Sequence, residues 1–241
     1  MRKSIVSIKQ DAAGMYETEV FDCDNPKSVV ICAHGNGVRR WDGESFFYNV
    51  AKRYTNHAFY LVDQTQPFDG GCELIDLRLM VHRVQDMLNQ ACSDYPGVPI
   101  TILAHSMGCG VASLLDVRNV TRMIFITPAS GDVVQINVAR YGKHILDGSM
   151  VKTSDGLNKL FSKEYMDSVS GVKWEEKYTA LLKHFGEIYV FEAGSDEILT
   201  EERRAANRTL PFKGYKVIDG ATHNFHDEAL EKLYSEIDDL L

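Results

Sequence analysis

Cysteine is scarce in this sequence and follows no recognisable framework. The 241 residues contain five cysteines, and no C-x-x-C pair occurs. An odd number at irregular spacings argues against a disulfide or zinc framework and is typical of reduced thiols inside a cell. We therefore predict a cytoplasmic protein with free thiols.

Long apolar runs and an excess of basic residues are missing as well. No stretch approaches the roughly 18 apolar residues of a membrane span, and the N-terminal residues lack the apolar segment of a signal peptide. Lysine and arginine number 26 against 34 aspartate and glutamate residues, which gives a formal net charge of −8. An acidic chain is a poor general binder of nucleic acid or anionic membrane. We expect a small-molecule substrate, and no nucleic-acid or membrane partner.

The composition is that of an ordinary globular protein, with 44% hydrophobic and 25% charged residues. Such usage excludes disorder, collagen-like repeats and coiled coil. We find no internal repeat, low-complexity tract or long linker. A single α/β unit commonly reaches this length, so the chain can bury a large core.

Strand-like and helix-like patterns alternate along most of the chain. Two antiparallel strands joined by a short turn are expected at residues 4–8 and 15–21. Further strands are expected at 28–33, 58–62, 98–104, 122–126, 187–193 and 213–218. Helices are expected at 45–54, 74–91, from 107 onward, 201–207 and 227–241. This alternation predicts an α/β fold with a mostly parallel sheet and helices on both faces.

Residues 131–184 break the alternation, with no clean strand–helix unit. An insert of this length in a compact domain is usually functional or disordered, and its aromatic residues argue against disorder. We interpret 131–184 as a cap or lid, and residues 1–130 with 185–241 as the core. In the alternative, the aromatic residues only pack the insert onto the core: Tyr141, Phe161, Tyr165, Trp174 and Tyr178.

A serine between a predicted strand and a predicted helix is the strongest functional signal. The strand at 98–104 leads directly into Ser106, and a helical pattern follows at once. This is the setting of a nucleophile elbow, in which small residues two before and two after the serine allow strand and helix to approach closely. Ala104 and Gly108 occupy those places. The alternative is that Ser106 is an ordinary helix cap.

A serine nucleophile needs a base, and the base needs a carboxylate that orients it. In folds with such an elbow the order along the chain is serine, acid, histidine. Asp196 follows the predicted strand at 187–193, and His223 follows the one at 213–218. We predict Asp196 and His223 as the partners of Ser106. Asp132, after an earlier strand, is the alternative acid, and His226 is the alternative base.

Several polar residues near these positions have simpler interpretations. Glu192 and Glu197 flank Asp196 as further acids. His34 and His105 are expected to pack and to bond to loop backbone. The sequence His-x-x-His-Asp at 223–227 lacks the third and fourth ligands of a zinc site, so we expect no metal.

An acyl-transfer site also needs two N–H donors for the oxyanion, one of them from the residue after the nucleophile. That residue is Met107. The second donor is expected from the loop after the strand at 28–33, which reads His-Gly-Asn-Gly. Its glycines let the backbone turn its amides inward. Asn36 is the candidate donor, with Gly37 as the alternative.

These pieces together resemble the serine α/β-hydrolases, and in finer detail small bacterial carboxylesterases of the cinnamoyl- and feruloyl-esterase type. The matching segments are Ala-His-Ser-Met-Gly around Ser106, His-Gly at 34–35, Gly-Ser-Asp ending at Asp196 and Ala-Thr-His ending at His223. The resemblance implies an α/β-hydrolase fold with about eight strands and a small inserted cap. It also implies a triad of Ser106, Asp196 and His223, with the Asn36 and Met107 amides as oxyanion hole.

Two departures from that pattern stand out. Ala104 takes the place of the first glycine of the elbow, as it also does in some lipases and esterases. Asn36 stands where the esterase group more often has an aromatic residue, which leaves the shape of the acyl pocket undetermined.

The expected function is hydrolysis of a carboxylic ester of a small or aromatic substrate through an acyl-enzyme, without a cofactor, by a monomer or homodimer. Thioesterase, lactonase or amidase chemistry would use the same residues. The same triad would also serve a lyase or a transferase, and the same fold would serve a non-catalytic binding protein, because a fold does not fix a function.

Overall fold

The computed structural model describes residues 4–41, 45–153 and 156–241. Residues 1–3 and 42–44 of the predicted core and residues 154–155 of the predicted cap lie outside the described residues. None of the predicted site residues is among them.

The main sheet has eight strands in the order β1-β2-β4-β3-β7-β8-β11-β12. The strands are β1 (Ser4–Asp11), β2 (Gly14–Phe21), β3 (Val29–Ala33), β4 (Ala58–Val62), β7 (Ile100–His105), β8 (Arg122–Ile126), β11 (Ile188–Ala193) and β12 (Gly214–Ile218). β1 and β2 are antiparallel to their neighbours, and every other pairing is parallel. The predicted mostly parallel sheet with an antiparallel start is confirmed.

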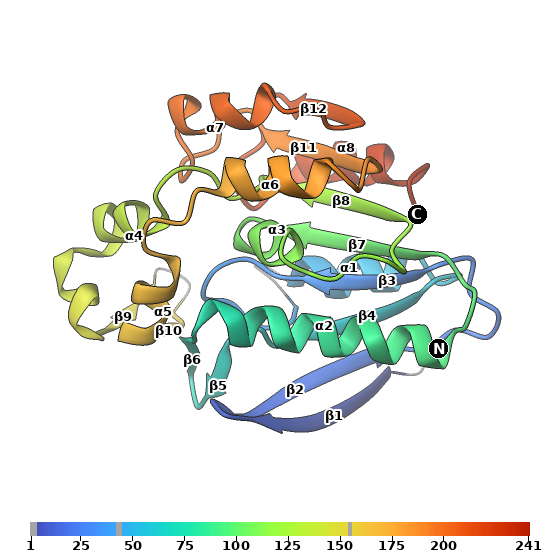
Figure 1. Ribbon diagram of the computed structural model, residues 1–241, viewed down its shortest axis with the longest axis horizontal. Coiled ribbons are helices and arrows are strands. Elements are labelled where there is room, and N and C mark those ends of the chain that lie inside the picture. The colour runs from blue at the N-terminus through green and yellow to red at the C-terminus, as the bar shows by residue number, and fades with distance from the viewer. Residues whose placement is uncertain (1–3, 42–44, 154–155) are drawn as a thin grey trace.

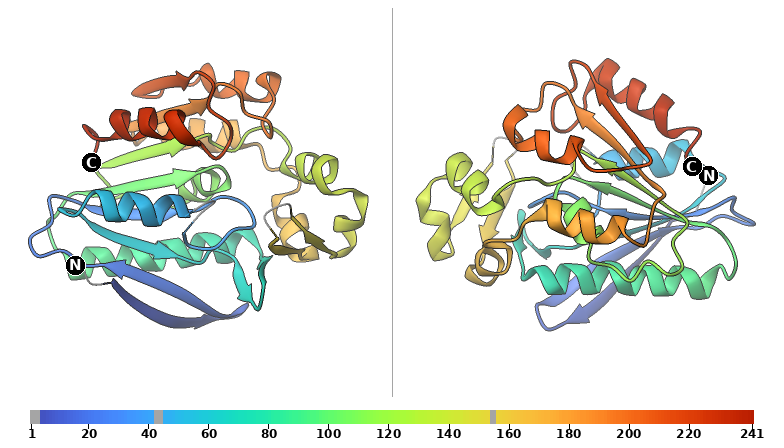
Figure 2. Two further views of the ribbon diagram at one scale, coloured as in Figure 1. Left: turned by 180° about the vertical axis from the view of Figure 1, so that it is seen from behind. Right: turned by 45° about the horizontal axis from the view of Figure 1, so that its top comes forward.

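Helices cover both faces of this sheet (Figures 1 and 2). One face carries α2 (Leu77–Asp94), α3 (Met107–Ala112) and α6 (Trp174–Leu182), and the other carries α1 (Phe46–Arg53) and α8 (Asp227–Ile237). Along β3, Val29 and Ile31 belong to the first core cluster, whereas Val30 and Cys32 belong to the second. Successive strand residues point to opposite faces, so a strand buried on both sides is apolar throughout.

A second, smaller sheet lies at the end of the main sheet toward which β7 and β8 run (Figures 1 and 2). Its order is β5-β6-β10-β9. The strands are β5 (Gln66–Phe68), β6 (Gly71–Leu74), β9 (Met150–Lys152) and β10 (Asn158–Phe161). Because β10 pairs in parallel with β6, this sheet joins residues of the predicted cap to a hairpin from the first half of the chain.

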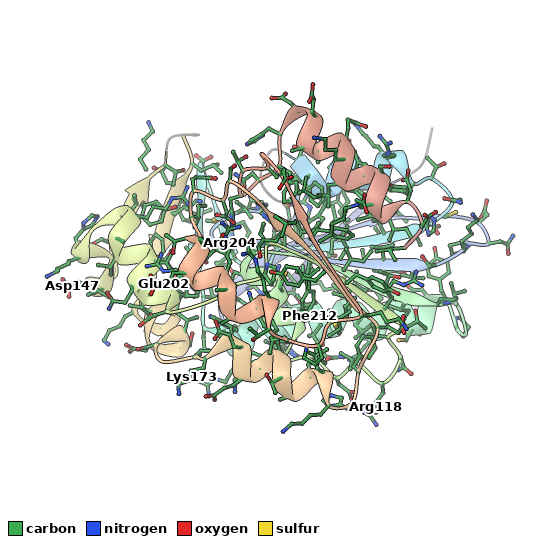
Figure 3. The ribbon with its side chains drawn as sticks, turned by 90° about the horizontal axis from the view of Figure 1, so that it is seen from above. Arg118, Asp147, Lys173, Glu202, Arg204 and Phe212 are labelled. Atoms are coloured by element: carbon green, nitrogen blue, oxygen red, sulfur yellow. The ribbon has the colours of Figure 1, made fainter. Side chains whose placement is uncertain are left out.

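Helices α4 (Val133–Tyr141) and α5 (Lys163–Val169) and the 3-10 turn η2 (Lys143–Asp147) complete this end of the molecule. Figure 3 shows Asp147 at its outer end, on the side away from the main sheet. One further short helix, α7 (Glu201–Arg208), follows β11. Its Arg204 donates to Glu192 Oε1 on β11 at 2.5 Å.

Three details of the sequence prediction are wrong. The C-terminal helix expected at 227–241 ends at Ile237. The helix expected at 74–91 spans Leu77–Asp94, because the Asp76 side chain caps it by accepting from Arg78 N at 2.7 Å, and residue 74 ends β6. The interval 131–184 contains regular elements, with three helices and two strands in its described part. Its strands have three and four residues, too short for an alternation pattern to stand out.

Arg83, on α2, forms hydrogen bonds with the β1–β2 hairpin. Its replacement by methionine should destabilise the fold. The buried guanidinium donates to Asp11 Oδ2 at 2.7 Å and to the Thr65 carbonyl at 2.7 Å. Burial raises the pKa of Asp11, but the Arg83 hydrogen bond and charge outweigh it and hold that pKa below its usual value. Arg83→Met leaves a carboxylate and a carbonyl without this donor, so the free energy of unfolding should fall by about 3 kcal/mol.

Urea unfolding measures this change. Arg78→Met is the matched control, since the Arg78 side chain is 91% exposed and its ion pair with Asp76 should contribute little. A loss of less than about 1 kcal/mol in Arg83→Met would show that the hairpin does not depend on this contact.

Candidate active site

Ser106 stands at a sharp turn between β7 and α3, as the sequence predicts. Its backbone has φ 52° and ψ −118°, a conformation that residues with a Cβ rarely adopt. Gly108 makes the turn possible, because a Cβ there would lie 2.0 Å from the carbonyl oxygen of Ala33. Ala104 is fully buried and pairs with Ala33 on β3. The two small residues thus let strand and helix approach closely.

Ser106, His223 and Asp196 form one chain of hydrogen bonds. His223 Nε2 lies 2.9 Å from Ser106 Oγ, and His223 Nδ1 lies 2.8 Å from Asp196 Oδ2. A carboxylate can only accept, so Nδ1–H donates to Asp196 and leaves the Nε2 lone pair facing the serine hydroxyl. The structure brings together the three residues that the sequence predicts as partners.

Asp196 is held as a carboxylate in a buried position. Its Oδ1 accepts from the backbone N–H groups of Ile198 at 2.8 Å and Leu199 at 2.7 Å. Burial raises its pKa, but the hydrogen bond and charge of His223 and the two amides outweigh burial, so the pKa lies below its usual value. The imidazole therefore faces an ionised partner at neutral pH.

Further contacts fix the backbone of His223. Its N–H donates to Glu197 Oε2 at 3.0 Å, and its carbonyl accepts from His105 Nε2 at 3.0 Å. His105 thus bonds to loop backbone, as predicted, and so does His34, whose Nε2 accepts from Gln64 N at 2.8 Å. The sequence marks Glu197 only as a neighbour of Asp196, and its contact with the histidine loop depends on the folded chain.

The alternative acids and base have different partners. Asp132 caps α4 and accepts from Gln135 N at 3.1 Å. His226 is the residue that precedes α8. Glu192, a residue of β11, accepts hydrogen bonds from the side chains of Arg204 and Tyr215. Within residues 4–41, 45–153 and 156–241, no three His, Cys, Asp or Glu side chains gather in a way that could hold a metal ion.

Asn36 and Met107 line the same cavity as Ser106. Met107 is the first residue of α3, so no carbonyl within the helix accepts from its N–H. Asn36 lies in the turn after β3, next to Gly37, whose φ of 67° favours glycine. Both residues thus line the cavity over the serine, whereas the alternative, Gly37, is not among the described residues that line it.

Residues from the predicted cap hold the Asn36 side chain in place. Tyr165 on α5 donates its hydroxyl to Asn36 Oδ1 at 2.8 Å, and Asn36 Nδ2 donates to Asn137 Oδ1 on α4 at 3.3 Å. Burial raises the pKa of Tyr165, so its hydroxyl keeps its proton and remains a donor. The loop after β3 and the elements of the cap are therefore coupled.

A cavity of about 230 Å³ opens over the serine. Besides Ser106, His223, Asn36 and Met107, it is lined by apolar residues such as Val133, Ile136, Ile198 and Leu199. It is also lined by polar residues that the sequence reasoning missed: Ser130, Asn137, Arg140, Thr153, Lys159 and Asn224. One signal could have revealed Lys159. In β10 it is buried on the same face as Phe161, so a strand assignment there would have placed a lysine at a core position.

No helix within the described part of the chain combines the length and the apolar character that crossing a membrane requires.

Comparisons with protein-family models and with curated protein sequences gave no match. Solved structures do match over nearly the whole chain. GrgF, an α/β hydrolase from Penicillium sp. sh18, is 10% identical with a TM-score of 0.71, over 99% of this chain and 96% of that one. Est1E from Butyrivibrio proteoclasticus is 13% identical with a TM-score of 0.67, over 98% and 96%.

A third similar structure is an esterase from Pyrococcus furiosus, 15% identical with a TM-score of 0.69, over 100% of this chain and 90% of that one. At such low sequence identities the similarity establishes the fold and not the activity. The arrangement of eight strands, the helices on both faces and these likenesses lead to one conclusion: the chain has the α/β-hydrolase fold.

Proposed function

We propose that this protein is a serine hydrolase that cleaves carboxylic esters of small or aromatic substrates through an acyl-enzyme. The observation that carries the proposal is the hydrogen-bonded chain from Asp196 through His223 to Ser106, whose hydroxyl faces a cavity. A serine, a base and an orienting carboxylate in this geometry suit acyl transfer. Esterases and hydrolases among the similar structures support the same interpretation.

In the proposed reaction, His223 Nε2 takes the proton of Ser106 as Oγ attacks the ester carbonyl. Asp196 holds the imidazole in the required tautomer and stabilises its charged form. The amides of Asn36 and Met107 donate to the developing oxyanion, and each such donor is worth about 3 kcal/mol in the transition state. His223 then returns the proton to the leaving alcohol, and a water activated by the same base releases the acid.

We further propose that, within residues 131–184, the elements from α4 to α5 act as a cap that shapes the acyl or alcohol site, whereas α6 packs on a face of the main sheet. They supply Asn137, Arg140 and Lys159 to the cavity wall. A cavity of about 230 Å³ suits a small substrate better than a long acyl chain. Est1E, one of the similar structures, has been solved with ferulic acid bound, 14% identical over 93% of this chain with a TM-score of 0.63, which supports an aromatic ester as one test substrate.

The proposal is tested with purified protein and p-nitrophenyl esters from acetate to decanoate, together with methyl ferulate and matched thioester, lactone and anilide substrates. We expect hydrolysis of short or aromatic esters that exceeds hydrolysis of the anilide, and none in Ser106→Ala. Preferential turnover of the thioester or lactone would move the assignment to that class. A folded protein that turns over none of these substrates would contradict the proposal.

A further inference from the structure

The Asn36 side chain connects the loop of the proposed oxyanion hole to two helices of the cap. Its Oδ1 accepts from the Tyr165 hydroxyl of α5 at 2.8 Å, and its Nδ2 donates to Asn137 Oδ1 of α4 at 3.3 Å. Burial raises the pKa of Tyr165, and hydrogen bonds with the side chains of Asn137 and Asn36 only partly offset this rise. The three side chains thus form one hydrogen-bonded group, in which the phenol keeps its proton.

The loop after β3 is held from two sides. Its first residue is fixed by the core, because His34 Nε2 accepts from Gln64 N at 2.8 Å and the His34 carbonyl accepts from Gln64 Nε2 at 3.1 Å. Asn36, two residues later, has its side-chain hydrogen bonds with the cap instead. The Asn36 N–H donates to no other described residue, so it is available to an oxyanion in the cavity that Asn36 lines. The direction of this N–H therefore depends on what holds the Asn36 side chain.

Tyr165 stands on a helix that is itself attached to the core. Its side chain is fully buried. Ser162, which caps α5, donates its hydroxyl to the Leu74 carbonyl at 2.6 Å, and near the other end of α5 Ser168 Oγ accepts from Leu77 N at 3.0 Å. A hydroxyl on a helix fixed at both ends can hold a loop residue in one place. Such precision matters, because a displacement of about 1 Å at a reacting centre can cost roughly 100-fold in rate.

We propose that Tyr165 is a positioning residue for the oxyanion hole, whose hydroxyl holds the Asn36 side chain so that the Asn36 N–H points at the reacting carbonyl oxygen. This inference rests on the proposed function and adds to it a residue that acts from the cap. Tyr165 is not among the described residues that line the cavity. Its effect should therefore appear in the transition state, where the oxyanion develops, and not in the binding of the substrate.

Tyr165→Phe tests this role, because it removes the hydroxyl and retains the ring that packs near Phe161. We expect kcat for a p-nitrophenyl ester to fall by about 10-fold or more, with KM changed by less than about threefold. Tyr60→Phe is the matched control, since Tyr60 is also buried and donates to Asp94 Oδ2 at 2.6 Å, and neither residue lines the cavity. It should keep kcat within about twofold.

Asn36→Ala separates positioning from a merely structural role, because it removes the acceptor of the Tyr165 hydroxyl and keeps the backbone N–H. Alone, it should lower kcat about as much as Tyr165→Phe does. If Tyr165 acts through Asn36, the double variant should lie within about twofold of the less active single variant. Losses that multiply would show that Tyr165 acts elsewhere. A kcat of Asn36→Ala within about twofold of the original would also overturn the proposal, whether or not Tyr165→Phe folds.

A labelling measurement separates this inference from the proposed function. A fluorophosphonate brings its phosphoryl oxygen to the oxyanion hole as Ser106 attacks phosphorus, so the labelling rate requires the hole but no turnover of an ester. We expect the second-order rate constant for labelling of Ser106 to fall by about 10-fold or more in Tyr165→Phe and to stay within about twofold in Tyr60→Phe.

The outcomes distinguish the two proposals. Ester hydrolysis by the original protein, with unchanged kcat and labelling in Tyr165→Phe, would overturn the positioning role alone. A higher KM with unchanged kcat would overturn it as well, because the hydroxyl would then act on substrate binding. Absent hydrolysis by the original protein, together with slower labelling of Tyr165→Phe, would overturn the esterase proposal alone. A folded original protein that neither hydrolyses esters nor reacts with the probe would overturn both.

Discussion

Replacing Ser106 by glycine is expected to abolish turnover and yet make the fold more stable. The loss of the nucleophile should lower kcat/KM by roughly 10⁴-fold or more. The φ of 52° at this position is strained for serine, and such strain costs of order 1–3 kcal/mol. Glycine relieves the strain, and after its greater entropy in the unfolded chain is subtracted, the free energy of unfolding should rise by about 1 kcal/mol.

Ser106→Ala is the matched control, because alanine also removes the hydroxyl but keeps the Cβ and therefore the strain. Its free energy of unfolding should stay within about 0.5 kcal/mol of the original protein. Urea unfolding of the three proteins measures the comparison, and ester hydrolysis measures the activity. Equal stability of the glycine and alanine variants would show that the turn at Ser106 is not strained.

The second large effect is expected from Asp196→Asn. Asparagine fits the same space but can donate a hydrogen bond from its NH₂ group to Nδ1. This favours the imidazole tautomer with its proton on Nε2, which cannot accept from Ser106. We expect kcat to fall by roughly 10³- to 10⁴-fold with the fold retained. Asp132→Asn, at the exposed cap of α4, should keep nearly full activity. A larger loss in Asp132→Asn than in Asp196→Asn would transfer the role of the acid to Asp132.

Asp196 should also contribute to the dependence of stability on pH. Its pKa in the folded protein lies below its usual value, so the folded state prefers the carboxylate more strongly than the unfolded state does. This stabilisation is complete above the unfolded pKa of about 3.9 and is lost as the pH falls through the lower folded pKa. Asp196→Asn should therefore show a shallower loss of stability on acidification, which thermal unfolding between neutral pH and about pH 3 would detect.

The strands of the main sheet and the site residues that follow them were predictable, because both depend on local patterns in the sequence. Continuous apolar runs such as Val29–Ala33 and Ala58–Val62 are typical of strands that are covered on both faces. Ser106, Asp196 and His223 could be selected because each follows a predicted strand, and parallel strands end at one edge of the sheet. Their mutual distances follow from the topology rather than from any local signal.

The small sheet and its contribution to the cavity were not predictable in the same way. Its β10 strand pairs with β6, more than 80 residues earlier in the chain, and neither strand exceeds four residues. Such pairings depend on where the rest of the fold places the two segments. That Asn137 and Lys159 line the cavity therefore became apparent only when the structure placed both beside the turn that carries Asn36.

The most direct test of the central claim, that His223 activates Ser106, is a peptide map after treatment with a fluorophosphonate probe. The original protein, Ser106→Ala and His223→Ala are treated in parallel, and mass spectrometry locates the adduct. The account predicts a single adduct on Ser106 that is absent from Ser106→Ala and strongly reduced in His223→Ala. An adduct at another residue, equal labelling in His223→Ala, or no labelling of the folded original protein would contradict it.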